Sequence, residues 1–377
     1  MVSGRLGSRF GLRNDRPYTT RSSRDLLPAL MLGWWWGDDY MPSSKDSYQI
    51  RSVSAAPLAG HAGLRLIGAS VKEGLLSARI QAEAILAYYE EFRPEIVFPL
   101  MDLTVECEAV GAAVRYEPDD APSVDRPLVR EAADLDRLRR PEVGLGNRLG
   151  VFVDALAWAR RHLPRGASLA AYIMGPFSMA GRLMDFAGLA TSLVIAPEIA
   201  HRLLAFCTEV LSDYLRALLA AEPDMVWILD PSTSLISPAH AESFSLPCLR
   251  RLIEEIRAAG KQAVVHNCGR IEHLLPLLAG LAPDGLLVGS CMDMAALAEA
   301  VPEKITLYGN LDPTAYFVSA RPEETAAATT ALLAAMGGRR NFVLSTGCDL
   351  PPNLRLENLH AFFAAAGMFP YRRARSA

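Results

Sequence analysis

The sequence lacks a hydrophobic run long enough to cross a membrane. The longest stretch without a charged residue in the body of the chain, Gly166–Gly181, contains Gly and Pro and falls short of the roughly 18 apolar residues that a spanning helix needs. An excess of positive charge is also missing, because 38 Lys and Arg stand against 42 Asp and Glu. We therefore expect a soluble protein that binds neither a membrane nor nucleic acid.

Cysteine is sparse and dispersed, which excludes the dense pattern of a small disulfide-bonded secreted domain. This usage favours a reducing, cytoplasmic setting in which the thiols are free or bound to a metal. With 51% hydrophobic and 21% charged residues, the composition is otherwise that of a globular protein, which excludes disorder. The 6 cysteines among 377 residues are Cys107, Cys207, Cys248, Cys268, Cys291 and Cys348.

Several well-known motifs are also missing. Neither G-x-S-x-G nor H-E-x-x-H occurs, which removes the common esterase and metalloprotease signatures. No G-x-G-x-x-G occurs either, which disfavours a doubly wound open sheet that binds a dinucleotide. The chemistry has to be sought in residues that are spread along the chain.

The first 50 residues differ from the rest of the chain. The first 25 carry six Arg and two Asp among Gly and Ser, without the apolar run of a secretory signal. We predict a partly flexible N-terminal extension over residues 1–50, a tail or an early start of translation rather than an organelle transit peptide. Trp34–Trp36 are predicted to cover one end of the fold or to form part of an oligomer contact, for which a homodimer is the simplest case.

From Arg51 onward, short apolar runs alternate with longer segments of helical spacing. Strands that are apolar throughout indicate a parallel sheet, and eight of them joined by helices predict an α/β fold, a single-domain (β/α)8 TIM barrel over residues 51–377. We expect one helix over Val71–Phe92 and a solvated excursion over Arg115–Arg148, which is rich in charge, Pro and Gly. The expected strands are Ser52–Pro57, Ile96–Met101, Ser168–Met174, Met225–Leu229, Gln262–Val265, Gly285–Gly289, Ile305–Tyr308 and Asn341–Ser345.

Polar residues follow nearly every expected strand. In a barrel of this kind the carboxyl ends of the strands carry the chemistry, so these residues are candidates for the site. Each of them taken singly fits a capping or loop hydrogen bond equally well, and only their clustering favours a functional role. They are His61 in the loop after the first strand, Asp102, Gly175, Asp230, His266 with Cys268, Ser290 with Cys291, Asn310 with Asp312, and Cys348.

A metal site is the sharpest prediction among them. His266 and Cys268 come at the end of the fifth expected strand, and Cys348 follows the eighth. Imidazole and thiolate are ligands that Zn²⁺ prefers, and three protein ligands with one open position describe a catalytic site. Residues from these two strands can face each other across the mouth of a barrel. Cys291 is a rival or extra ligand. The other cysteines are predicted to be structural: Cys107, Cys207 and Cys248.

Five segments, in this order along the chain, resemble the uroporphyrinogen decarboxylase superfamily, and within it the corrinoid-dependent methyltransferases such as methylcobamide:coenzyme M methyltransferase. The Gly-Pro-Phe and Gly-Asn-Leu-Asp-Pro segments are shared by the whole superfamily and indicate the fold. The His-x-Cys with the later Gly-Cys is specific to the methyltransferase branch. The segments are Met101–Gly111, Gly175–Ala180, His266–Gly269, Gly309–Pro313 and Gly347–Pro352.

The resemblance implies a zinc-dependent methyltransferase. It would move a methyl group between a corrinoid and a zinc-activated thiol, a folate or a methoxylated or methylated small molecule. A partner protein would carry the corrinoid, because the cobalamin-ligating D-x-H-x-x-G is absent and Val264 stands where its Asp would be. One alternative is a decarboxylase of a tetrapyrrole or another carboxylated substrate, although the Arg-Gln-Ala-Gly-Arg-Tyr signature of the true decarboxylase is missing. A second alternative is a barrel whose metal site is structural or absent and which serves as a binding subunit of a methyltransferase complex.

The resemblance also assigns roles to individual residues. Asp102 falls where the superfamily keeps an important acid, and Glu106 or Glu108 would be a fourth ligand or a proton acceptor. The predicted catalytic residues are Asp102, Glu106 and Asn310. The residues predicted to bind the cofactor are His61, Asp230 and Gly175. The predicted zinc ligands are His266, Cys268 and Cys348.

Overall fold

A computed structural model describes residues 54–367 of the chain, apart from residues 145 and 338. The N-terminal extension predicted over residues 1–50, including Trp34–Trp36, lies outside the described residues. Within the described ranges, none of the helices combines the length and the apolar character that crossing a bilayer requires.

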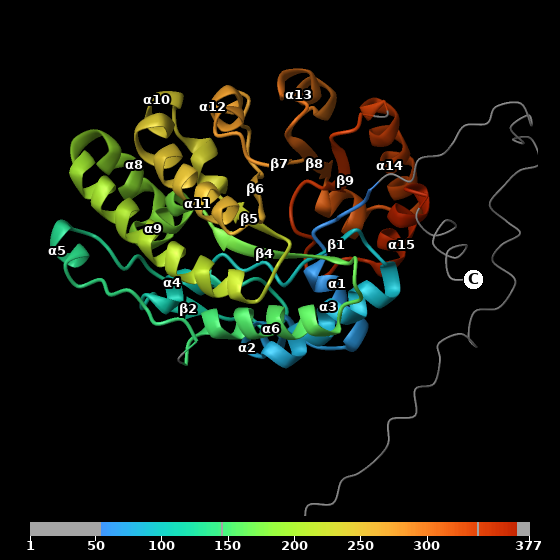
Figure 1. Ribbon diagram of the computed structural model, residues 1–377, viewed down its shortest axis with the longest axis horizontal. Helices are drawn as coiled ribbons and strands as arrows, with labels where there is room; N and C mark the ends of the chain where they lie inside the picture. The colour runs from blue at the N-terminus through green and yellow to red at the C-terminus, as the bar shows by residue number, and fades with distance from the viewer. Residues whose placement is uncertain (1–53, 145, 338, 368–377) are drawn as a thin grey trace, which may run out of the picture. The chain divides into compact units, whose positions relative to one another are not determined.

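A curled sheet of seven parallel strands forms the centre of the fold (Figure 1). Its order is β1-β4-β5-β6-β7-β8-β9, and every neighbouring pair is parallel. β5 is buried along its whole length, as expected for an apolar strand in a parallel sheet covered by helices. The strands are β1 Ile96–Val97, β4 Ser168–Met174, β5 Met225–Leu229, β6 Gln262–Asn267, β7 Gly285–Val288, β8 Thr306–Leu311 and β9 Phe342–Thr346.

Helices follow the strands of this sheet and cover its outer side (Figure 1). The α-helices are α1 Gly60–Ile67, α2 Val71–Leu76, α3 Ala78–Phe92, α4 Val105–Ala109, α5 Ala132–Leu135, α6 Arg148–His162, α7 Pro176–Met184, α8 Phe186–Ile195, α9 Pro197–Ala220, α10 Pro238–His240, α11 Leu246–Ala258, α12 Leu275–Gly280, α13 Met294–Ala300, α14 Pro322–Met336 and α15 Leu356–Ala365. A 3-10 turn, two π turns and a small hairpin complete the described chain: η2 Pro231–Leu235, η3 Ala241–Ser245, η4 Ala315–Ser319, and β2 Val114–Arg115 with β3 Ser123–Val124.

Residues 54–57, the described part of the first expected strand, form a single bridge between the two edges of the sheet. Ala55 forms a parallel bridge with Leu344 of β9, and the Ala55 carbonyl accepts a hydrogen bond of 3.3 Å from the backbone N–H of Glu95, beside β1. Pro57 has no N–H to continue the ladder, which limits the pairing of this segment. The described sheet therefore has seven strands, and a fully closed eight-stranded barrel stays a prediction.

This first segment is nevertheless tied firmly to the end of the last strand. The backbone N–H of Leu58 donates to the Thr346 hydroxyl over 3.1 Å, and the Ser345 hydroxyl donates to the Ala56 carbonyl over 2.7 Å. The backbone N–H of Leu350 donates in turn to the Leu58 carbonyl over 2.8 Å. These bonds join residues almost 290 positions apart in the chain and hold the loop after β9 in place.

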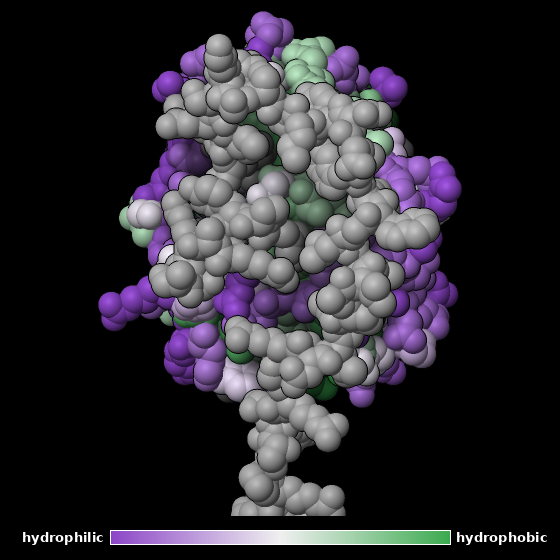
Figure 2. Space-filling view, turned by 90° about the vertical axis from the view of Figure 1, so that its right-hand side faces the viewer, coloured by the Kyte–Doolittle hydropathy of each residue, from purple (hydrophilic) through white to green (hydrophobic). Residues whose placement is uncertain are grey.

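Aromatic side chains fill the inner side of the curled sheet. The ring centroids of Trp227 lie 4.9 Å from Phe98 and 4.8 Å from Tyr308, and Phe98 stacks on Tyr172 at 5.5 Å. On β4 the next residue, Ile173, belongs instead to the layer between sheet and helices, as the alternation of a strand requires. Where described residues are visible in Figure 2, hydrophilic side chains make up most of the surface.

The structure contradicts one sequence expectation about the connecting segments and supports most of another. The helix expected over Val71–Phe92 is two helices, because Ser77 is extended and its hydroxyl accepts a hydrogen bond from Ile80 N–H, which starts α3 anew. The excursion over Arg115–Arg148 is exposed or half-buried along most of its length, as expected, and among its described residues only Val129 and Arg148 are buried. Charge density along the chain does not distinguish a solvated Arg from one that has buried partners.

Gly63 provides a test of the packing between α1 and α3. A Cβ at Gly63 would lie 2.1 Å from the carbonyl oxygen of Ala84. We therefore expect Gly63→Ala to lower the free energy of unfolding by about 1–3 kcal/mol, because the helices must separate. Gly280→Ala is the control, since no atom lies within 4 Å of its added Cβ. Urea unfolding should show Gly280→Ala equal to or more stable than the wild type, and equal losses in both variants would contradict the prediction.

Candidate metal centre

His266, Cys268 and Cys348 come together at the carboxyl end of the sheet. His266 is the second-last residue of β6, Cys268 follows that strand directly, and Cys348 follows β9 by two residues. One nitrogen and two sulfur atoms, one from each residue, all lie within 4.8 Å of one another. Within the part of the chain that the structure describes, this is the group of His, Cys and acidic residues that could hold a metal ion.

The donor atoms fit zinc in kind and in spacing. Zn–N bonds of about 2.1 Å and Zn–S bonds of about 2.3 Å at tetrahedral angles separate a nitrogen and a sulfur ligand by about 3.6 Å. The Cys348 sulfur lies 3.7 Å from His266 Nε2. His266 is 2% exposed, and its Nδ1 lies 3.3 Å from the Leu287 carbonyl, to which it can donate. That contact leaves the Nε2 lone pair facing the two sulfurs, as a metal ligand requires.

The two thiols differ in their readiness to lose a proton. Hydrogen bonds from the Cys348 thiol and from His266 outweigh burial and hold the pKa of Cys268 well below the usual thiol range. The pKa of Cys348 is raised, because its proton is held by Cys268 and because burial disfavours a second thiolate. A low-pKa thiolate beside an imidazole is the environment in which sulfur binds metals.

The other cysteines lie outside this group. Cys291, the rival ligand, is exposed, and its thiol donates to the Cys268 carbonyl over 3.6 Å. Cys107 and Cys207 are buried on α4 and α9, where burial raises the pKa of both thiols. Cys248 lies on α11 and donates to the Phe244 carbonyl over 3.6 Å.

His61 and Asp349 form a contact beside the metal group that the sequence did not reveal. His61 lies in α1 rather than in the expected loop, and its Nδ1 is 3.1 Å from Asp349 Oδ2 and 3.0 Å from the Leu350 carbonyl. Burial lowers the pKa of His61, but Asp349 and the Leu350 carbonyl outweigh it, so that the pKa is raised overall. Because Asp349 follows Cys348 directly, this contact fixes the loop that carries the third ligand.

Asp102 lies in a buried ionic network rather than at an open position. Arg148 pairs with Asp102 and with Glu108, and its Nη2 donates to the Thr104 hydroxyl over 2.9 Å. The N–H and the hydroxyl of Thr104 both donate to Asp102 Oδ1 over 2.7 Å. The Tyr116 hydroxyl donates to Glu108 over 2.7 Å. No signal in the sequence pointed to Arg148, because it lies 46 residues after Asp102 within a charge-rich stretch.

Glu106 lies next to this network, in a small buried cavity. Its Oε1 accepts a hydrogen bond of 2.8 Å from Met174 N–H, whereas its Oε2 and the Tyr172 hydroxyl have no partner among the described residues. Both side chains line the cavity together with Asp102. Burial raises the pKa of Glu106 to about 7, against the lowering effect of the Met174 hydrogen bond. A buried carboxyl with this pKa can hold or release a proton near neutral pH.

A pH series tests this state of Glu106. Because its pKa in the folded chain is above the ordinary value of 4.5, the fold favours the protonated form, and this stability is lost as pH rises from 4.5 through 7. We expect Glu106→Gln to gain about 3 kcal/mol over the wild type across that interval. Urea unfolding between pH 4.5 and 8 measures the gain, with Glu90→Gln on the exposed face of α3 as the control. Parallel curves for Glu106→Gln and wild type would contradict the prediction.

The remaining candidates have partners of their own at the strand ends. Asp230 is 1% exposed and accepts hydrogen bonds from Ser178 N–H over 2.8 Å and from the Thr233 hydroxyl over 2.8 Å. Gly175 packs on Asp230 so closely that a Cβ would lie 2.2 Å from its Cβ. Asn310 donates to the carbonyls of Gly289 and Met292 over 2.9 and 2.7 Å. Cofactor binding by Asp230 and Gly175 and catalysis by Asn310 stay predictions.

Comparison with known proteins identifies the family. The model of a protein family described as uroporphyrinogen decarboxylase (URO-D) matches residues 58–368. The chain belongs to the uroporphyrinogen decarboxylase family. A solved structure of a methyltransferase from Methanosarcina mazei has the same fold as this chain, with a TM-score of 0.77. The two are 23% identical, and the match covers 85% of this chain and 95% of the other.

Similar proteins include relatives named as methyltransferases and relatives named as decarboxylases. The methylcobamide:CoM methyltransferase MtbA of Methanosarcina acetivorans is 26% identical over 273 residues, which are 72% of this chain and 78% of the relative. The uroporphyrinogen decarboxylase of Homo sapiens is 28% identical over 276 residues, 70% of this chain and 74% of the relative. The resemblance found in the sequence, to the family and to its methylcobamide:CoM methyltransferases, is confirmed.

Proposed function

We propose that this chain is a zinc-dependent methyltransferase. It would move a methyl group between a corrinoid on a partner protein and a small molecule, either a thiol, a folate or a methoxylated or methylated compound. The observation that carries the proposal is the convergence of His266, Cys268 and Cys348, whose donor atoms suit zinc. The similarity to MtbA, named for methyl transfer from a methylcobamide to CoM, supports the same reaction class.

Different residues would bind the metal, position its ligands and exchange a proton. His266, Cys268 and Cys348 would hold the metal. When bound, the metal would lower the pKa of a substrate thiol, so that the thiolate could act as the nucleophile. His266 keeps its Nε2 directed at the sulfurs through the contact of Nδ1 with the Leu287 carbonyl. Asp349 and His61 hold the loop of Cys348. Glu106, with a pKa of about 7, is suited to take up or release a proton during turnover.

Metal analysis and a methyl-transfer assay test the proposal together. The purified, dialysed full chain is expected to contain about one zinc ion per chain and to demethylate methylcobalamin in the presence of a suitable thiol. Absorbance of the corrinoid follows the transfer, and a panel of thiols, folate and methoxylated donors identifies the other substrate. A metal-free wild type that decarboxylates a porphyrinogen would refute the proposal and support the decarboxylase alternative, which the human relative represents.

A further inference from the structure

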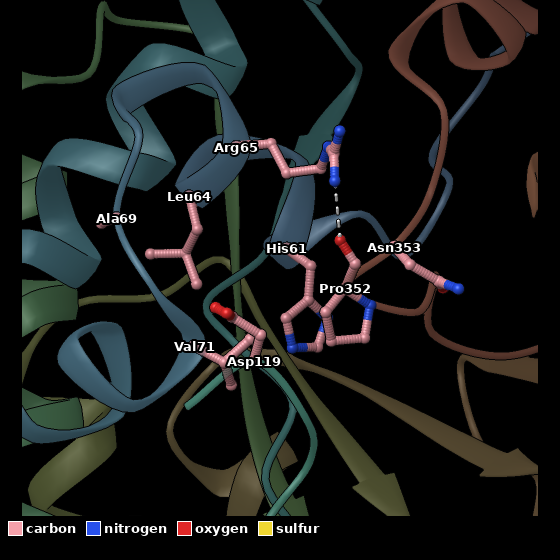
Figure 3. A pocket seen from close by; sticks show the side chains of 8 residues that line it. All are labelled: His61, Leu64, Arg65, Ala69, Val71, Asp119, Pro352 and Asn353. Atoms are coloured by element: carbon pink, nitrogen blue, oxygen red, sulfur yellow. Dashed lines mark hydrogen bonds between the residues drawn. The ribbon is translucent and has the colours of Figure 1, made fainter. Parts of the chain in front are cut away.

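A cavity of about 300 Å³ lies beside the loop of Cys348 (Figure 3). Its walls come from three parts of the chain: the stretch from α1 to the start of α2, the excursion after α4, and the loop after β9. The volume is at the lower end of the range of small-molecule sites. The lining residues are His61, Leu64, Arg65, Ala69, Val71, Asp119, Pro352 and Asn353.

His61 connects this cavity with the metal group. Its Nδ1 is engaged by Asp349 and by the Leu350 carbonyl, and its Nε2 has no partner among the described residues. The side chain is only 5% exposed and lines the cavity. Because Nε2 is not among the enclosed unpartnered atoms of the described residues, it is open to the cavity, where a ligand group can exchange a hydrogen bond with it. The raised pKa of His61 favours the form in which Nε2 donates.

Charges of both signs stand at the rim. The Arg65 guanidinium donates to the Pro352 carbonyl over 3.4 Å (Figure 3), and no carboxylate lies within ion-pair distance of it among the residues that the structure describes. Asp119 is exposed on the side of the cavity away from Asn353 and is likewise without an ion-pair partner there. Leu64 and Val71 are buried and provide apolar contact. A ligand with an anionic end, a cationic end and a short apolar body matches this lining.

We propose that this cavity binds a small zwitterion of the α-amino acid type, with its carboxylate toward Arg65 and His61 and its ammonium group toward Asp119. This assignment rests on the proposed function. The zwitterion would be the methyl donor or acceptor of that reaction, since the loop of Cys348 also supplies Pro352 and Asn353 to the cavity. The inference therefore assigns the substrate class of the proposed reaction. It makes His61 and Arg65 specificity-determining residues rather than metal ligands.

Calorimetric titration of the full chain with three matched compounds tests the assignment. The zwitterion L-methionine is expected to bind at least about fivefold more tightly than its deamino acid, 4-(methylthio)butanoate, and than its decarboxylated amine, 3-(methylthio)propylamine. Arg65→Met and Asp119→Asn should each weaken methionine binding about two- to fivefold, as expected for exposed charge pairs. Arg79→Met removes an exposed Arg that pairs with Glu83 on α3 and should leave the affinity unchanged.

The outcomes separate this inference from the proposed function. Tighter methionine binding in Asp119→Asn, or equal affinity for the butanoate, would show a site for simple anions and overturn the zwitterion. Unchanged methionine affinity in Arg65→Met and Asp119→Asn, together with loss of binding in Cys348→Ser, would place the ligand on the metal group alone and overturn the cavity as its site. Absence of zinc and of methyl transfer would refute the proposed function alone, because the charge-dependent titration needs neither. Zinc and transfer without any charge-dependent binding would refute the inference alone.

Discussion

Replacement of Cys348 by Ser is expected to remove zinc from the dialysed protein and to lower the rate of methyl transfer at least about a hundredfold. Loss of a residue that only supports a metal ligand already costs about 10–100-fold in metal affinity or activity, so that loss of a ligand should cost at least as much. The fold should survive, because Cys348 is half-buried in a loop after β9 and not in the core. Zinc content, corrinoid absorbance and circular dichroism of the same preparation measure the three effects.

Cys291→Ser is the matched control for that experiment. Cys291 is the exposed neighbour whose thiol only donates to the Cys268 carbonyl, outside the group of three donor atoms. The Cys291→Ser variant should therefore retain zinc and activity, whereas Cys268→Ser should behave like Cys348→Ser. Full activity in Cys348→Ser, or equal losses in Cys291→Ser, would remove Cys348 from the ligand set.

Arg148→Met is expected to lower the free energy of unfolding by about 3–5 kcal/mol. The side chain of Arg148 is 7% exposed and that of Asp102 is 0% exposed, so the substitution leaves a buried carboxylate without its countercharge. Glu108 loses the same partner at a more exposed position. Urea unfolding at neutral pH measures the loss.

Two further variants show whether the loss comes from the unpaired charge. Addition of Asp102→Asn to Arg148→Met should restore part of the stability, because the buried charge is then removed together with its partner. Arg140→Met breaks exposed pairs with Asp213 and Glu209 and should cost at most about 1 kcal/mol. A loss in Arg148→Met no larger than that in Arg140→Met would contradict a buried network.

Seven of the strands could be predicted because a buried parallel strand leaves a strong local pattern. Runs such as Met225–Leu229 are apolar throughout and are separated by helical spacing, so their type and order follow from the chain alone. The strand ends then locate His266, Cys268 and Cys348 near one another, since parallel strands end at one edge. Here the local pattern and the topology are sufficient for a prediction.

Contacts between distant polar residues could not be predicted in the same way. Arg148 resembles its exposed neighbours in sequence, and only the packed structure shows that it is buried against Asp102. The pairing of His61 with Asp349 depends on how α1 meets the loop after β9. Residues 54–57 of the first expected strand form a single bridge to β9, which their run of small and apolar residues does not reveal. Tertiary packing decides all three.

The bonds that tie Ala56 and Leu58 to Ser345 and Thr346 have a consequence for biosynthesis. Cys348 lies beyond β9, and its loop is held by contacts with the first described segment of the chain. A ribosome-bound chain that has not yet released β9 offers only His266 and Cys268 to a metal. Contacts between residues 288 and 289 positions apart are also expected to form late in folding, because closing so long a loop costs chain entropy. On the proposed function, zinc would therefore bind after translation ends, once folding is complete.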